Sequence, residues 1–413
     1  MELSLQIKLG VKTMNRLKLI VFASFFIFSA ALNAQSRRSE ILLTDSAKIS
    51  LITCSPGDEL YSIFGHSAIR VKDKPGDLDV VFNYGTFDFS EPNFYPKFVR
   101  GRLNYILSAY DFEDFKESYI EENRSISEMQ LNITAQEKQK LFDSLIINYK
   151  PENRYYRYDF FYDNCATRIR NILVEAIPRK MEFDYSSFHK GQTFRKLLMP
   201  YLTHMPWSKL GINLLLGIPA DRVAEPWDYM YLPDHLDAAF KNAYFKSGKL
   251  DRTPATQTPK LILGRKLSSL KVIWWSPVWV FLLVLIITSG LSYIYIKKVY
   301  KCAWFDRLLL FGTGLLGVLF TFLWVGTAHK SMAWNMNILW ANPINLFVAF
   351  ALTSKRFGRF VKAYLRVNFV ILVLLLATWP ILPQTLPFVV YPLVIALALR
   401  MFIMNSYMKA KGE

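Results

Sequence analysis

The amino-acid sequence predicts an exported α+β domain of antiparallel strands, followed by an all-α membrane domain of about five transmembrane helices. At 413 residues the chain exceeds what one hydrophobic core usually supports, so two structural units are expected. Between about 35 and 270, charged and apolar residues alternate as in globular domains, whereas long apolar runs dominate after Val272. An export signal at the N-terminus places the first unit outside the cytoplasm.

Residues 1–34 have the pattern of a secretory signal peptide. Arg16 and Lys18 precede the apolar run LIVFASFFIF, and the small residues of SAALNA follow it. A positive head, an apolar middle and a small-residue end are the three parts of such a signal. Cleavage is expected after Ala34, with Met14 as the natural start. The alternative is an uncleaved anchor helix, which exports the following residues equally.

Five apolar segments predict the membrane spans. They lie near residues 273–296, 308–326, 338–352, 366–381 and 386–404. A helix needs about 20 apolar residues to cross a bilayer. The third segment is short and contains Pro343, and the fourth ends at Pro380. Because proline interrupts helices, these two spans are expected to be tilted or broken.

Basic residues predict the orientation of the membrane domain. They cluster in two loops and after the last span: Lys297, Lys298, Lys301 and Arg307; Lys355, Arg356, Arg359, Lys362 and Arg366; Lys409 and Lys411. All three clusters fall on one side of the membrane, which the positive-inside rule makes cytoplasmic. Nucleic-acid binding, the usual interpretation of a net charge of +17, is set aside because an exported domain meets no nucleic acid.

This orientation divides the chain into five parts. They are a signal peptide (1–34), a periplasmic domain (35–246), a linker with several Thr, Pro and Lys residues (247–271), a transmembrane domain (272–404) and a cytoplasmic tail (405–413). The expected location is the inner (cytoplasmic) membrane, with the exported domain on the periplasmic side.

The exported domain combines antiparallel strands with amphipathic helices. The segments LYSIFGHSAIRV (60–71) and LDVVFNYGTFDF (78–89) flank the reversal KDKPGD, which predicts a β-hairpin. Further strands are expected at 129–133 and 156–162, and helices at 111–121, 135–149 and 165–176. Thr134 and Glu137 form a capping-box pattern at the start of the second helix.

Cys165 stands at the first turn of the last predicted helix, directly after Asn164, which is a good N-cap residue. There the helix dipole favours an anion and lowers the pKa of a thiol toward the reactive thiolate. Three interpretations remain open: a nucleophile, a buried inert cysteine, or half of a disulfide with Cys54 in an oxidising compartment.

A cysteine nucleophile needs a base, usually a histidine. The exported domain contains His66, His189, His204 and His235. Only His66 lies in a strand-like segment, after Gly65; the other three lie in loops or at a helix start, where surface or capping roles are commoner. If the hairpin register holds, Asn83 shares a face with His66 and orients its imidazole, with Asp88 as the reserve residue.

The order of a strand with Gly-His, a second strand and Asn-Cys opening a helix resembles circularly permuted papain-like thiol enzymes. These include relatives of the NlpC peptidases and the lecithin:retinol acyltransferase-like proteins. More closely, the chain resembles the Lnb-type lipoprotein N-acyltransferases over about 50–400. The resemblance rests on PGDELYSIFGHSAIRV (56–71), FNYGTFDF (82–89), YDFFYDNCATRIRN (158–171), TFRKLL (193–198), LLGIPADR (215–222), YLPDHL (231–236) and AHKSMAWNMNILWANPINL (328–346).

This resemblance implies that Cys165 and His66 are the catalytic pair, while Asn83 as third member is inferred from the hairpin. It implies attack of the Cys165 thiolate on a membrane phospholipid ester, formation of an acyl thioester, and transfer of the acyl chain to the α-amine of a lipoprotein's lipidated N-terminal cysteine. The backbone N–H of Cys165 and a neighbour are expected to stabilise the oxyanion. No cofactor is expected, and the histidines lack the paired spacing of a zinc site.

Substrate contacts are expected beside these motifs and in one outward loop. The residues are Phe64, Tyr84, Asn164 and Arg168 in the exported domain, with His329 and Asn335 in the loop between the second and third spans. That loop also contains Asn337, Trp334 and Trp340. Tryptophan at this depth is usually an interfacial anchor; the sharper interpretation is that His329 and the asparagines hold a lipid headgroup or the acceptor.

Two other functions remain open. One is a membrane-bound cysteine hydrolase, a lipid esterase or an amidase or peptidase of the cell envelope, in which water takes the acyl group. A soluble peptidase would not need five spans, which counts against the peptidase form. The other is a non-catalytic envelope scaffold with a structural cysteine.

Overall fold

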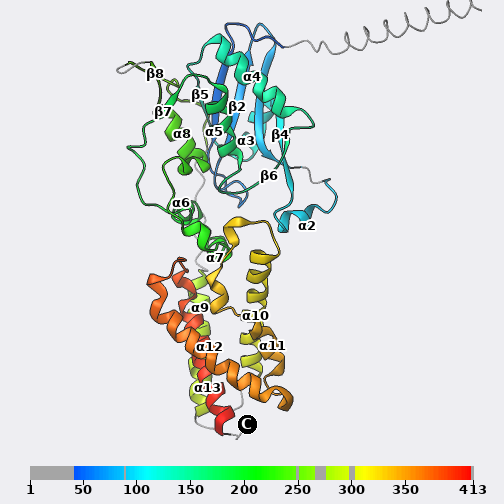
Figure 1. The fold of residues 1–413 in the computed structure, drawn as a ribbon, viewed down its shortest axis with the longest axis vertical. Helices are drawn as coiled ribbons and strands as arrows, with labels where there is room; N and C mark the ends of the chain where they lie inside the picture. Colours follow the sequence, from blue (N-terminus) through cyan, green and yellow to red (C-terminus); the bar gives the residue numbers. More distant parts are fainter. Residues whose placement is uncertain (1–40, 88–89, 248–250, 266–275, 297–302, 411–413) are drawn as a thin grey trace, which may run out of the picture. The chain divides into compact units, whose positions relative to one another are not determined.

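The exported domain is built on an antiparallel sheet with strand order β10-β5-β1-β2-β3-β4-β6 in the computed structural model (Figure 1). The structure describes residues 41–413 except 88–89, 248–250, 266–275, 297–302 and 411–413, so the expected signal peptide lies outside the described residues. The strands are β1 (Lys48–Cys54), β2 (His66–Asp73), β3 (Leu78–Thr86), β4 (Asn104–Asp111), β5 (Ile126–Gln130), β6 (Tyr155–Arg157) and β10 (Lys260–Leu263).

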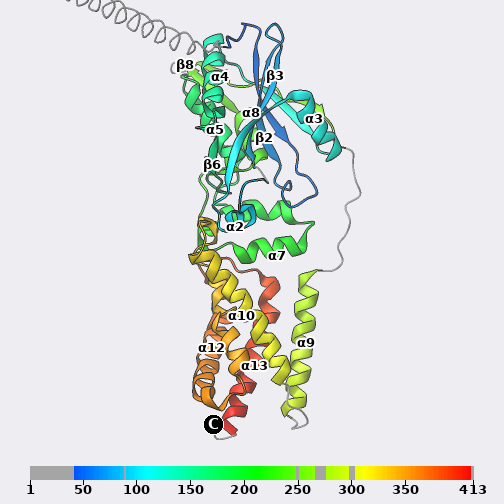
Figure 2. The same ribbon diagram turned by 90° about the vertical axis from the view of Figure 1, so that its right-hand side faces the viewer.

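Helices cover both faces of this sheet. They are α3 (Phe112–Glu121), α4 (Ala135–Tyr149), α5 (Cys165–Ala176) and α8 (Pro233–Lys241). Figure 2 shows α3 on one side of the sheet and α4 and α5 on the other. Because both faces are covered, β1 and β2 are buried along most of their length, and the site lies on strands with little room to move.

The β-hairpin and the three helices predicted from sequence are confirmed. β2 and β3 pair with Ile69 opposite Phe82, the register that brings Asn83 to the side of His66. Helix α4 begins with the expected capping box, in which Thr134 and Glu137 each bond the other's backbone N–H.

Two segments differ from the predicted strands. Residues 59–65 form turns before β2 begins, with the backbone N–H groups of Ser62 and Gly65 bonded three residues back. In the segment 156–162, only β6 is extended, because Asp159 and Asp163 exchange backbone hydrogen bonds across a tight turn. The alternating aromatic residues of this segment match a strand pattern, although part of the segment forms a compact turn.

Part of the segment expected to be a linker forms strands instead, one of them in a second, smaller sheet. This sheet contains β7 (Met181–Phe183), β8 (Ala243–Ser247) and β9 (Asp251–Pro254). Strands β9 and β10 therefore both fall within 247–271, and β10 pairs with β5 at the edge of the large sheet. The described part of this segment belongs to the folded domain, since it covers a strand edge that would otherwise stay open.

The remaining helices are mostly in the second half of the chain. They are α2 (Phe94–Val99), α6 (Phe194–Leu198), α7 (Pro206–Leu215), α9 (Pro277–Ile296), α10 (Ala303–Val325), α11 (Ile344–Ala351), α12 (Gly358–Thr378) and α13 (Tyr391–Ala410). Short 3₁₀ helices connect several of them: η1 (Met199–Leu202), η2 (Ile218–Asp221), η3 (Asp228–Tyr231), η4 (Lys330–Met332), η5 (Met336–Leu339), η6 (Lys355–Phe357), η7 (Trp379–Ile381) and η8 (Phe388–Val390).

Four helical segments in the described part of the chain are long and apolar enough to cross a membrane. They are Pro277–Ile294, Ala303–Val325, Lys355–Ile381 and Phe388–Ser406. The segment predicted as a third span, 338–352, instead contains the end of η5, Pro343 and the eight-residue α11. A helix of that length covers about 12 Å, less than half of the hydrocarbon core, so the expected count of about five is not confirmed.

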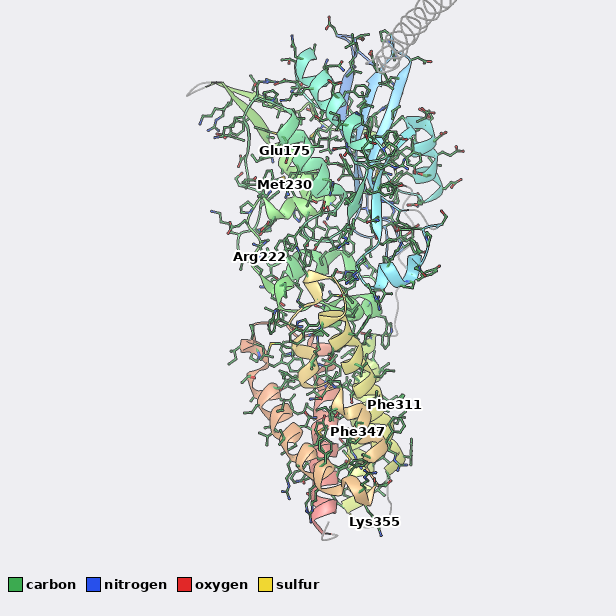
Figure 3. All side chains as sticks on the ribbon, turned by 45° about the vertical axis from the view of Figure 1, so that its right-hand side comes forward. Glu175, Arg222, Met230, Phe311, Phe347 and Lys355 are labelled. Atoms are coloured by element: carbon green, nitrogen blue, oxygen red, sulfur yellow. The ribbon has the colours of Figure 1, made fainter. Side chains whose placement is uncertain are left out.

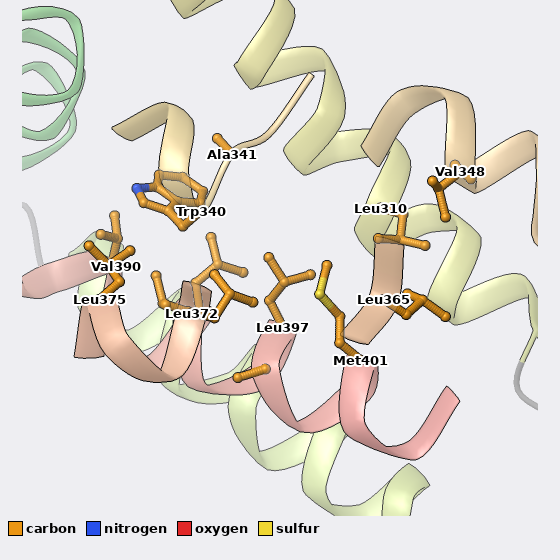
Figure 4. Close-up of a cluster of buried hydrophobic side chains, with 14 of the residues drawn as sticks. Leu310, Trp340, Ala341, Val348, Leu365, Leu372, Leu375, Val390, Leu397 and Met401 are labelled. Atoms are coloured by element: carbon orange, nitrogen blue, oxygen red, sulfur yellow. The ribbon is translucent and has the colours of Figure 1, made fainter. Parts of the chain in front are cut away.

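A dense apolar core holds the membrane domain together. Figure 4 shows Trp340 and Leu372 packed with Leu397 and Met401, side chains that come from η5's C-cap, α12 and α13. Phe311 and Phe347, labelled in Figure 3, are both exposed to the surroundings. Apolar side chains face outward as well as inward, which is the pattern of a bundle surrounded by lipid.

One buried ion pair ties three of these helices together. The Arg400 guanidinium on α13 donates to both carboxylate oxygens of Asp306 on α10, at 2.6 and 2.9 Å, and to the Ser292 hydroxyl on α9 at 3.1 Å. Charges in a membrane domain are tolerated when they are paired in this way.

The C-terminal end of α7 is where the exported and membrane domains join, and both belong to one compact unit, Asp45–Glu413. From the exported side, Arg195 donates to the carbonyls of Asn213, Leu216 and Gly217. From the membrane side, amide groups of three residues donate to the carbonyls of Leu214, Leu215 and Leu216; these residues are Asn335, Asn337 and Gln384. The free carbonyls of one helix end are thus shared between two domains.

Replacing Arg195 by Ala is expected to lower the free energy of unfolding by about 3–5 kcal/mol, because the buried carboxylate of Asp221 loses its ion pair. Arg222→Ala is the matched control: Arg222 is half-exposed and pairs with Asp228, so a loss of about 1 kcal/mol or less is expected. Equilibrium unfolding of both purified variants in mixed micelles measures the difference. Equal losses would contradict the assigned role of Arg195.

Candidate active site

Cys165 is the first residue of α5, and Asn164 fixes that end of the helix. The Asn164 side-chain oxygen accepts a hydrogen bond from the Thr167 N–H at 2.9 Å, and the backbone N–H of Asn164 donates to the Thr167 hydroxyl at 2.8 Å. Its amide nitrogen also donates to the carbonyls of Phe160 and Tyr231. Because every polar atom of this side chain is engaged, Asn164 positions the cysteine and has no free atom for a substrate.

His66 opens β2 opposite Cys54 of β1. The preceding Gly65 has φ +77°, and a Cβ at this residue would lie 2.9 Å from the Cys54 carbonyl oxygen, so only glycine fits this close approach. The His66 Nε2 atom lies 2.5 Å from Oδ1 of Asn83 on β3. The His66 ring also forms a hydrogen bond with Cys165.

The Cys165 thiol and the His66 imidazole shift each other toward their charged forms. Burial alone raises the pKa of Cys165, but the nearby His66 charge, its hydrogen bond, and the backbone N–H groups of Ser67 and Ala166 together lower the pKa below its usual value. Burial alone lowers the pKa of His66, but Cys165 and the hydrogen bond that the ring donates to Oδ1 of Asn83 raise the pKa above its usual value. Each group therefore favours the charged form of the other, the thiolate of Cys165 and the imidazolium of His66.

Cys54 is chemically different from Cys165. Both thiols are free, so the disulfide considered from sequence is absent between these two described residues. Cys54 is buried in the core beneath α3, and burial raises its pKa to about 12 despite a hydrogen bond with Tyr119. Cys54 is therefore an inert core residue, while the remaining cysteine, Cys302, lies outside the described residues.

Two residues beside Cys165 were missed by the sequence reasoning. Gly85 has φ +94° at an irregularity in the β3–β4 pairing, and a Cβ there would lie 3.5 Å from the Cys165 Cβ and 3.9 Å from the Tyr156 hydroxyl. Tyr156 on β6 is buried, and its hydroxyl has no hydrogen-bond partner among the described residues. A glycine inside a strand pattern was a usable signal for Gly85; nothing local marked Tyr156.

The other predicted substrate residues of the exported domain are near this pair but already have partners. The Tyr84 hydroxyl accepts from the Asn148 amide at 2.9 Å. Arg168 forms an ion pair with Asp163 and lies over the Tyr156 ring, 3.9 Å from its centroid. The ring of Phe64 is half-buried and packs against two other aromatic rings. The reserve residue Asp88 lies outside the described residues.

Residues of the outward loop of the membrane domain that were expected to contact lipid instead make buried contacts within the protein. Asn335 is buried and donates to the end of α7, and Trp340 is fully buried and donates to Asn337, so Trp340 is a core residue rather than an interfacial anchor. Trp334 is exposed. His329 lies against Gly101 of the exported domain, whose Cβ would stand 3.0 Å from the ring.

This arrangement supplies a nucleophile, a proton carrier and an orienting amide within one small region. A thiolate attacks an electrophilic carbonyl carbon, and an adjacent imidazolium protonates the group that leaves. No group of three or more His, Cys, Asp or Glu side chains in the described part of the chain is arranged to hold a metal ion. Such an arrangement is chemically capable of covalent catalysis at a carbonyl carbon.

Two protein-family models match the chain. The model described as the Lnb N-terminal periplasmic domain matches residues 35–199, and the model described as the Lnb transmembrane domain matches residues 268–411. No curated protein and no solved structure matches. The first match contains His66, Asn83 and Cys165, and the second contains every candidate span.

His66→Ala is expected to slow alkylation of Cys165 by iodoacetamide at pH 7 at least tenfold. Iodoacetamide reacts with the thiolate, and without the imidazolium the burial of Cys165 raises its pKa, so less thiolate is present. Mass spectrometry of the Cys165 peptide measures the rate, and Cys54, with a pKa of about 12, serves as the unreactive internal control. An unchanged rate in the variant would contradict the ion pair.

Proposed function

Because the chain belongs to the Lnb family and is a multi-pass membrane protein with a periplasmic N-terminal domain, we propose that it is a lipoprotein N-acyltransferase of the inner membrane. The observation that carries the proposal is the thiolate–imidazolium pair of Cys165 and His66, oriented by Asn83. Acyl donor and acceptor are both held in lipid, and a site attached to a membrane domain meets both.

In the first half of the reaction, the Cys165 thiolate attacks the carbonyl carbon of a phospholipid ester. A carbon–sulfur bond forms, and the carbonyl electrons move onto the oxygen. When the tetrahedral intermediate collapses, the carbon–oxygen bond breaks and the His66 imidazolium gives its proton to the departing oxygen. The products are an acyl thioester on Cys165 and a lysophospholipid.

In the second half, the α-amine of a lipoprotein's lipidated N-terminal cysteine attacks the thioester. The now neutral His66 takes a proton from the attacking nitrogen, the carbon–sulfur bond breaks, and the sulfur leaves as a thiolate beside the restored imidazolium. The product is an amide. A thioester suits this role because it is more reactive toward amines than the original oxygen ester.

Tyr156 supports the first step as a donor to the developing oxyanion. Its hydroxyl is buried, lacks a partner among the described residues, and shares the space above Gly85 with Cys165. Burial raises the pKa of Tyr156 well above its usual value, so the hydroxyl keeps its proton. A donor held in place before the reaction stabilises charge without reorganisation, which is the largest contribution in many acyl transfers.

The basic ends of the membrane helices support an inner-membrane location. Lys355 lies at the end of the helical domain where α13 also finishes (Figure 3). Arg307, near the start of α10, donates to Thr353, just before Lys355, so the described basic loops meet at one end of the bundle. By the positive-inside rule this end is cytoplasmic, and the other end faces the periplasm.

Cys165→Ser is expected to abolish N-acylation of lipoproteins while leaving the protein in the membrane, because serine beside this imidazole is a far weaker nucleophile. Mass spectrometry of lipoprotein N-terminal peptides from cells with the wild-type or variant gene measures the result. Cys54→Ala is the control and should retain acylation. Full N-acylation by the Cys165 variant would refute the proposal, and free fatty acid in place of acylated lipoprotein would identify a hydrolase.

Tyr156→Phe is expected to lower kcat for thioester formation on the order of 10²-fold, the usual cost of one oxyanion donor. Alkylation of Cys165 by iodoacetamide should stay within about twofold of wild type, because that reaction forms no oxyanion. A parallel fall in both rates would assign Tyr156 a structural role instead.

A further inference from the structure

The short helix α2 presents an apolar surface that no other part of the described chain covers. Tyr95, Phe98 and Val99 are 74%, 51% and 46% exposed, and no residue of this helix is buried. Three large apolar side chains on a six-residue helix are unusual for a surface in water, and such patches generally mark a binding site or a membrane contact.

The end of α2 is attached to the outer end of a candidate membrane span. The Ala328 N–H donates to the Arg100 carbonyl at 2.9 Å, directly after α2, and His329 lies against Gly101. These contacts come only a few residues after Val325, where α10 ends. Figures 1 and 2 both show α2 beside the loop that follows α10. The apolar surface of α2 is therefore at the level where the bilayer begins.

Basic and aromatic side chains surround this surface. Arg100, Arg102 and Lys330 are exposed around the contact between α2 and the loop. Trp334 in the same loop is exposed and packs against Trp324 of α10, with ring centroids 4.8 Å apart. Cations paired with lipid phosphates and tryptophan at headgroup depth are the usual companions of an interfacial helix.

A row of aromatic side chains connects α2 to the active site. Phe98 stacks on Phe94 within the helix, and Phe94 lies 5.6 Å from Phe87 at the end of β3. Phe87 lies 5.4 Å from Tyr105, whose ring is 6.4 Å from Tyr156 and 4.4 Å from Tyr158. Every member of the row except Tyr156 is at least partly exposed, and the row ends at Tyr156, which is buried beside Gly85 and Cys165.

We propose that α2 inserts its apolar side chains into the outer leaflet of the membrane and that the aromatic row from Phe98 to Tyr156 guides a phospholipid acyl chain to Cys165. The guidance part rests on the proposed function, whereas the insertion of α2 does not. The bilayer is the occupant that fits, because the surface is apolar at its centre, basic at its rim and continuous with a membrane span. A protein partner would not require attachment to the end of α10.

Photo-cross-linking tests the insertion. p-Benzoylphenylalanine replaces Phe98 in the full-length protein, reconstituted in vesicles of phosphatidylethanolamine and phosphatidylglycerol with alkyne-tagged acyl chains. Ile147 is the matched control position, because it is an apolar side chain of α4 that is 50% exposed. A lipid adduct at position 98 at least tenfold above that at 147 is expected. Equal yields, or adducts with protein alone, would overturn the insertion of α2.

Phe98→Asp tests the guidance, since a carboxylate resists insertion into lipid. Thioester formation on Cys165 from vesicle phospholipid is expected to fall at least tenfold, with alkylation of Cys165 by iodoacetamide unchanged and Ile147→Asp equal to wild type. An equal thioester rate in Phe98→Asp and wild type would overturn the guidance. If the wild-type protein forms no thioester, the proposed function and the guidance fail together, and the cross-linking result still decides whether α2 inserts.

Discussion

The N-terminus of α5 is the constraint on which the site depends. A buried thiolate is costly, and the pKa of the buried Cys165 thiol is lowered only because His66 and two backbone N–H groups near the sulfur favour its charged form. That requires the first turn of the helix to be held against the start of β2, within hydrogen-bond distance of His66. Four hydrogen bonds of Asn164 supply this hold, two to Thr167, one to Phe160 in the preceding turn and one to the distant Tyr231. Gly65 then permits the close approach of β1 and β2, and Gly85 adopts a positive φ beside Cys165.

The need to pair buried polar groups also determines how the two domains join at the end of α7. A helix end leaves several carbonyls without partners, and burying them is unfavourable unless donors are brought to them. Arg195 comes from one domain, while Asn335, Asn337 and Gln384 come from the other. This helix end and the contact of Ala328 with Arg100 together attach the exported domain, and they set how far Cys165 stands from the lipid that its proposed substrates occupy.

Much of the exported domain follows from local sequence. The hairpin register depends on one Pro-Gly reversal and on side-chain alternation, so Asn83 was expected beside His66 before any tertiary contact was known. The capped starts of α4 and α5 follow from Thr134 and Asn164, because a cap bonds residues within one turn of itself. The division into an exported and a membrane half follows from composition alone.

Other features depend on partners far along the chain, and local patterns do not reveal them. The residues of β10 were expected to be part of a linker, but they form a strand that pairs with β5. From sequence alone Asn335 was expected to bind a lipid headgroup. In the structure its amide donates to carbonyls at the end of α7, about 120 residues earlier. The unpaired hydroxyl of Tyr156 lies near Cys165 only because the fold brings β6 beside the start of α5. Sequence determined the local elements and the catalytic candidates, whereas tertiary structure decided which polar groups remain free to react, because that depends on every distant neighbour.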